Sequence, residues 1–147
     1  MMLVFCALAK TAGAQEIRLA EARDLNPDPQ IVEINLTAKL ATVEVAPGKK
    51  VTAWTYDGGL PGPLIRGNVG DRLIVHFTNE LPEPTTVHWH GVRVPIEMDG
   101  VPEISQPDVG QGESFTYDFI LRDASLYSAR SNGVRADGIG NSSALRG

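Results

Sequence analysis

Short runs in which apolar residues occupy every second position constrain the fold of this chain most strongly. In the clearest run, Leu73, Val75 and Phe77 are separated by single residues, and the segments 32–36 and 115–119 alternate in the same way. A period of two is typical of a half-buried β-strand. Pro-Gly, Gly-Asp and Asp-Gly pairs between the runs favour turns. The pattern predicts an all-β protein, an antiparallel β-sandwich.

Composition agrees with this class and excludes others. The chain has 147 residues, enough for one domain with a single core, and its 15 glycines and 10 prolines suit a loop-rich architecture. A net charge of −5 without a basic run argues against nucleic acid as a partner. Cys6 is the only cysteine, so the chain cannot form an internal disulfide.

The first thirty residues are predicted to direct export of the protein and not to belong to its folded domain. Met1 to Ala9 is apolar, and Ala12-Gly13-Ala14 fits a signal-peptidase site, which predicts a signal peptide at 1–14 whose basic start is clipped. The run is too short to span a bilayer. A merely apolar N-terminus is the alternative. The polar stretch 15–30 is predicted as a linker, and the mature protein is predicted to be periplasmic or secreted.

The residues with the clearest chemistry are two histidines in a β-prone run. His88 and His90 flank Trp89, so on a strand their imidazoles share one face and Trp89 points into packing. Two neighbouring imidazoles suit copper or zinc, which makes His88 and His90 candidate metal ligands. The alternative is a pair of surface histidines around a buried tryptophan. The third histidine, His76, is predicted to be an exposed or edge residue.

Several segments around this run resemble one family. The stretches 54–66 and 70–81, the His88-Trp89-His90-Gly91 motif, the segment 98–102 and the run 115–119 look like the first cupredoxin domain of multicopper oxidases, laccase-like enzymes in particular. The resemblance covers 31–127. It implies a cupredoxin-like Greek-key β-sandwich as the fold class.

The resemblance also implies roles for individual residues. It makes His88 a ligand of a type 2 copper and His90 a ligand of a type 3 copper in a trinuclear cluster that reduces O2 to water. Electrons would come from phenols or metal ions through a type 1 copper, and the other cupredoxin domains of the enzyme would be partners. Asp99 is a conceivable polar neighbour, although a turn role is favoured. Met98 is expected to pack in a loop, since no cysteine accompanies it in a blue copper site.

The sequence departs from the family after Tyr127. A Tyr-His-Pro-His-like motif is expected there, and the chain reads Ser128-Ala129-Arg130-Ser131 instead. The segment 128–147 is therefore predicted to be a disordered, non-family tail produced by a frameshift or wrong gene model, which leaves the sandwich incomplete at its C-terminal strands. With two ligands, and no residue predicted to be catalytic, the chain alone is not expected to reduce O2. A stand-alone copper-binding module without oxidase activity and an inert fragment are the alternatives.

Overall fold

The computed structural model describes residues 20–123 and 128–131; Cys6 and the predicted signal peptide lie outside this part of the chain. Strands dominate the described residues, and the one helical segment among them is a single 3-10 turn, η1. No helix within them is long and apolar enough to cross a membrane. The elements are β1 (Ile31–Ala46), β2 (Lys49–Tyr56), β3 (Arg72–Asn79), β4 (Val87–His90), η1 (Ile96–Met98), β5 (Ser114–Ile120) and β6 (Ser128–Ser131).

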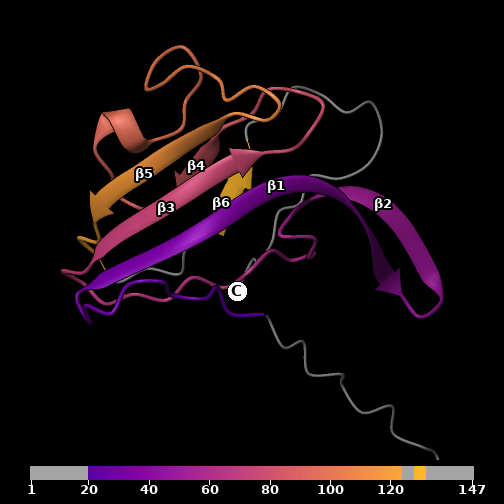
Figure 1. Cartoon of the computed structure of the whole chain (residues 1–147), viewed down its shortest axis with the longest axis horizontal. Helices are drawn as coiled ribbons and strands as arrows, with labels where there is room; N and C mark the ends of the chain where they lie inside the picture. Colours follow the sequence, from indigo (N-terminus) through magenta and orange to yellow (C-terminus); the bar gives the residue numbers. More distant parts are fainter. Residues whose placement is uncertain (1–19, 124–127, 132–147) are drawn as a thin grey trace, which may run out of the picture.

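Two sheets form the sandwich. The larger has the strand order β2-β1-β3-β5, and the smaller pairs β4 with β6. Figure 1 shows β4 and β6 behind β3 and β5, while the β1–β2 hairpin curves away from the other strands. β1 and β3 pair in parallel, from Ile31 opposite Arg72 to Ala38 opposite Asn79, whereas the other pairs are antiparallel. The sandwich is thus as predicted, but its larger sheet is mixed rather than purely antiparallel.

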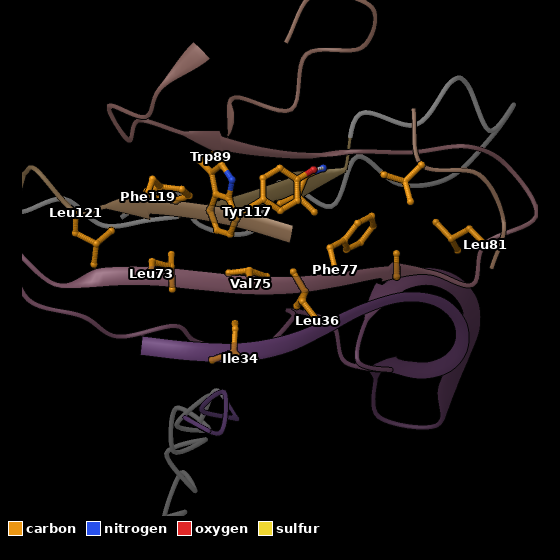
Figure 2. Packing of buried hydrophobic residues seen from close by; sticks show 13 residues of the cluster. Ile34, Leu36, Leu73, Val75, Phe77, Leu81, Trp89, Tyr117, Phe119 and Leu121 are labelled. Atoms are coloured by element: carbon orange, nitrogen blue, oxygen red, sulfur yellow. Dashed lines mark hydrogen bonds between the residues drawn. The ribbon is translucent and has the colours of Figure 1, made fainter. Parts of the chain in front are cut away.

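The core lies between the two sheets and follows the alternation of the sequence. In β3, Leu73, Val75 and Phe77 are buried, and the residues between them are only half-buried. Tyr117 and Phe119 of β5 are buried on the same side, which confirms their prediction as core residues, and Phe115 packs against them half-buried. Figure 2 shows Phe119 and Tyr117 on either side of Trp89, with Leu73, Val75 and Phe77 in a row below them. Burial of this apolar layer is the main force that holds the sheets together.

The outer face of the larger sheet is mostly polar, and His76 lies there. Its side chain is 42% exposed, and its Nε2 lies 2.8 Å from Oε1 of Glu33 on β1. Exposure was predicted for His76. The alternative of an edge position is wrong, because β3 lies between β1 and β5.

The residues on either side of the predicted domain also have defined backbone contacts. The amide of Ala22 donates to the carbonyl of Leu64 at 2.8 Å, and Leu64 donates back to Ala20. At the other end, Ser128–Ser131, within the predicted tail, forms β6 and pairs with β4. Main-chain pairing with β4 orders them despite a sequence without strand alternation. Residues 132–147 lie outside the described part of the chain, and the domain boundaries stay a prediction.

Candidate metal centre

The short strand β4 presents one face to the core and one to the surface. Val87 and Trp89 are almost fully buried, His88 is half-buried and His90 is exposed. The Trp89 ring meets Tyr117 edge-on with centroids 5.5 Å apart and Phe119 at 5.3 Å. This packing confirms that Trp89 points inward. It also fixes which face of β4 carries the two histidines, because a shift of one residue would bury them and expose Trp89.

The backbone of Asp99 determines the tautomer of His88. Nδ1 of His88 lies 2.9 Å from the carbonyl oxygen of Asp99. A carbonyl oxygen only accepts, so Nδ1 carries the proton of this hydrogen bond and the neutral ring keeps a lone pair on Nε2. The carboxylate Oδ1 of Asp99 is 3.3 Å from the same Nδ1. His88 is therefore oriented as metal-binding histidines commonly are, with the other ring nitrogen available.

The loop that carries Asp99 is held against the edge of β4. Thr86 donates its hydroxyl hydrogen to the carbonyl oxygen of Gly100 at 2.5 Å, and both residues are buried. Gly100 has φ +68°, and a Cβ at this position would overlap the carbonyl of Val87. Only glycine combines this backbone conformation with so close an approach. The contact holds Asp99 within reach of His88.

His90 is the second candidate ligand. Its ring centroid lies 5.8 Å from that of His88, with the planes at 65° to each other. The two imidazoles are thus neighbours on one surface. They could serve one metal ion or two adjacent ions, since imidazole nitrogen is a ligand for copper and for zinc.

The described residues fit a two-nitrogen metal site, but they do not fit a cluster of three coppers. Within 20–123 and 128–131, no group of three or more His, Cys, Asp or Glu side chains converges to hold a metal ion. Asp99 approaches the protonated nitrogen of His88 rather than the free one, so it orients a ligand. Three coppers need many more ligands than two imidazoles.

The remaining candidates lie elsewhere, as their sequence context indicated. Met98 ends η1, packs against the core, and its Sδ accepts the amide of Asp118 at 3.4 Å, which confirms a packing role in the loop. His76 belongs to the outer face of the larger sheet. The sequence favours a turn role for Asp99, and the structure shows in addition that its carbonyl accepts a hydrogen bond from His88. The Met98-Asp99-Gly100 segment is the part of the sequence that points to this contact, because Asp-Gly favours a tight turn there.

Comparison with known proteins identifies the family to which the chain is similar. The model of a family described as multicopper oxidase matches residues 37–143, beyond the predicted boundary at Tyr127. The chain is 40% identical over 107 residues to multicopper oxidase MmcO of Mycobacterium tuberculosis, an alignment that covers 72% of this chain and 21% of that protein. It is also 40% identical over 119 residues to Laccase-2 of Cryptococcus neoformans var. grubii, with 77% and 19% covered.

A solved structure shows the same fold. The crystal structure of a multi-copper oxidase from Pseudomonas thermotolerans superposes with a TM-score of 0.62 and 48% identity, covering 64% of this chain and 23% of that one. The chain therefore spans only about a fifth of the length of the relatives it matches. Copper is the cofactor that these names indicate. With its cupredoxin-like β-sandwich and its paired histidines on β4, this chain belongs to the multicopper oxidase family.

Proposed function

We propose that His88 and His90 are copper ligands, and that this chain supplies them to a laccase-like oxidase whose other ligands lie in further cupredoxin domains. The single observation that carries the proposal is the hydrogen bond from His88 Nδ1 to the Asp99 carbonyl, which leaves Nε2 unprotonated in the neutral ring. His90 adds a second imidazole 5.8 Å away. Imidazole suits copper in both of its common oxidation states.

The whole enzyme would couple the oxidation of phenols or metal ions to the reduction of O2 to water. Within it, we assign His88 and His90 the roles of a type 2 and a type 3 ligand, respectively. Asp99 orients His88, and Trp89 fixes the face of β4 that carries both rings. No step of O2 reduction is assigned to this chain alone, because two imidazoles do not hold three coppers. A periplasmic or secreted location would suit this chemistry.

A second candidate function is a small copper-binding module without oxidase activity. The observation that favours it is the two-nitrogen site itself, which contains enough ligands for one weakly held ion among the described residues. Both candidate functions use His88 and His90 as copper ligands, but only the oxidase requires further cupredoxin domains. Oxygen uptake with a phenolic donor distinguishes them, because only the multidomain enzyme is expected to consume O2.

Copper titration of the chain tests the ligand assignment. We expect about one Cu(II) per chain, with the affinity lowered about tenfold or more by His88→Ala and by His90→Ala, since each substitution removes one of two nitrogens. His76→Ala is the matched control, because His76 lies on the outer face of the other sheet. Equal losses in all three variants, or no loss in the first two, would reject the assignment.

A further inference from the structure

The short strand β4 is anchored to the core by the side chain of Tyr117 on β5. The hydroxyl oxygen of Tyr117 accepts the main-chain amide hydrogen of Val87 at 2.8 Å, and both residues are fully buried. The ring of Tyr117 also meets the indole of Trp89 edge-on, with centroids 5.5 Å apart (Figure 2). Val87 and Trp89 are the two neighbours of His88 in the chain. One side chain of the larger sheet therefore contacts the residues on both sides of a candidate ligand.

Tyr117 is itself held firmly in place. It lies in the middle of β5, opposite Val75 of β3. Its ring packs against that of Phe115, with centroids 4.8 Å apart, and lies 6.4 Å from that of Phe77. A large side chain in so close-packed an interior has little freedom to change its rotamer. The hydroxyl is therefore presented to the amide of Val87 from a fixed point of the larger sheet.

The position of the β4 backbone determines where the ring of His88 lies. That ring is oriented by the Asp99 carbonyl, 2.9 Å from Nδ1, and a hydrogen bond of this length does not survive a large shift of the strand. A buried amide that loses an acceptor is costly, so removal of the Tyr117 hydroxyl should favour states in which β4 has shifted or opened to water. The hydroxyl thus acts on His88 through the main chain of β4, without touching the imidazole.

We propose that Tyr117 is a positioning residue for the candidate metal site: its hydroxyl holds the Val87 amide, and this contact keeps His88 within reach of the Asp99 carbonyl and its Nε2 available. This inference rests on the proposed role of His88 and His90. Groups that orient a metal ligand commonly change metal affinity when they are removed, although they do not contact the ion. Tyr117 is one step further from the ion than Asp99, because it orients the strand rather than the ring.

Tyr117→Phe tests the proposal with Cu(II) as the probe, because it removes the hydroxyl and keeps the ring. The copper affinity should fall about fivefold. Electron paramagnetic resonance of the copper-loaded variant should show more than one copper environment, since the strand that carries the ligands is no longer fixed. The Val87 amide should exchange its hydrogen faster than in the unmodified chain. An affinity and a spectrum equal to those of the unmodified chain would overturn the proposal.

Thr55→Val is the matched control, because it also removes one buried hydroxyl that bonds to the main chain. Thr55 lies on β2, at the opposite edge of the larger sheet from β5, and donates to the carbonyl of Lys39 at 2.9 Å. The control should lower the thermal stability as Tyr117→Phe does, but leave the copper affinity and the spectrum unchanged. Equal losses of affinity in the two variants would mean that general destabilisation is the cause, and would reject a positioning role.

Failure of this inference is distinguishable from failure of the proposed function. His88→Ala tests the proposed function, since it removes a proposed ligand. Nitrogen NMR of the histidine rings tests the inference without metal, at a pH where the rings are neutral. His88 should be protonated on Nδ1 in the unmodified chain and in Thr55→Val, and should show both tautomers in Tyr117→Phe. That change supports Tyr117 as the residue that positions His88 even if the chain binds no copper through it, whereas an unchanged tautomer rejects the inference.

Discussion

The imidazole of His88 donates a hydrogen bond from Nδ1 to the main-chain carbonyl of Asp99, at 2.9 Å, across eleven residues of sequence. The carboxylate of the same aspartate is farther from that nitrogen, at 3.3 Å. The backbone therefore fixes the tautomer of His88, and the side chain of Asp99 adds a negative charge near it. These two contributions are separable, because a substitution at Asp99 removes the carboxylate and keeps the carbonyl.

Asp99→Ala is accordingly expected to have a small effect. We expect the free energy of unfolding to change by about 0.5 kcal/mol or less, because the carboxylate is partly exposed. The Cu(II) affinity should fall by about threefold, since only a nearby charge is lost. Chemical denaturation and copper titration measure the two quantities. A loss as large as that of His88→Ala would show that the carboxylate itself is required for binding.

Gly100→Ala should be far more damaging than Asp99→Ala, although it removes no functional group. The added Cβ overlaps the carbonyl of Val87, and the positive φ of Gly100 disfavours alanine. We expect a destabilisation of about 2–4 kcal/mol, measured by urea denaturation. In the fraction that folds, the copper affinity should fall too, because the loop must move away from β4. Gly112→Ala is the control, since it shares a positive φ but has open space around its Cβ.

Asn79→Ala is expected to destabilise the chain through lost hydrogen bonds. The fully buried Asn79 donates from Nδ2 to the carbonyls of Glu83 and Val109, and its Oδ1 accepts the amide of Leu81. Truncation removes all three hydrogen bonds and leaves the buried Leu81 amide without this acceptor, whereas the Val109 carbonyl keeps its hydrogen bond from the Thr85 amide. The loss should cost about 2–4 kcal/mol in urea denaturation. A change below about 1 kcal/mol would mean that water replaces the amide.

Acid should destabilise the chain partly through Glu33. The hydrogen bond with His76 is the main cause that lowers the pKa of Glu33, with a second contribution from the Asn26 side chain. A carboxyl group with a lowered folded-state pKa adds stability above its unfolded value, and this contribution is lost as the pH falls through the folded value. Stability measured between about pH 5 and 3 should therefore fall less steeply in Glu33→Gln.

His76→Ala provides the control for that pH dependence. It removes the main cause of the lowered pKa and leaves the Asn26 hydrogen bond to Glu33. The slope of stability against pH should then lie between those of the unmodified chain and Glu33→Gln. Identical slopes in all three proteins would exclude Glu33 as a contributor. Asp24, Asp118 and Asp123 also have lowered pKa values, so some acid sensitivity should persist in every variant.

The sequence predicted those strands in which apolar and polar residues alternate, because in them the apolar residues are the ones that become buried. The run at Leu73, Val75 and Phe77 became β3, and Trp89 between two histidines became the inward residue of β4. In both cases a side chain's preference for the core determines the face of the strand. Met98 was expected to pack in its loop for a different reason, the absence of a cysteine with which it could form a blue copper site, and it packs half-buried against the core.

Features that depend on partners distant in sequence could not be predicted. The parallel pairing of β1 with β3 joins segments about forty residues apart, and neither segment encodes the direction of the other. Likewise, Ser128–Ser131 has no strand pattern and is ordered by main-chain bonds to β4. The hydrogen bond from His88 to Asp99 depends on the path of a whole loop.

The position of Trp89 has a practical consequence. Trp89 is joined by peptide bonds to both candidate ligands, yet its ring is buried against Tyr117 and Phe119. Its fluorescence should therefore have the blue-shifted emission of a buried indole, and a paramagnetic ion captured on the opposite side of the strand would quench it. Trp54, on the β1–β2 hairpin, supplies a second emitter in the other sheet. Replacing either tryptophan by phenylalanine would assign the signal, and the chain would then report its own metal occupancy without an added dye.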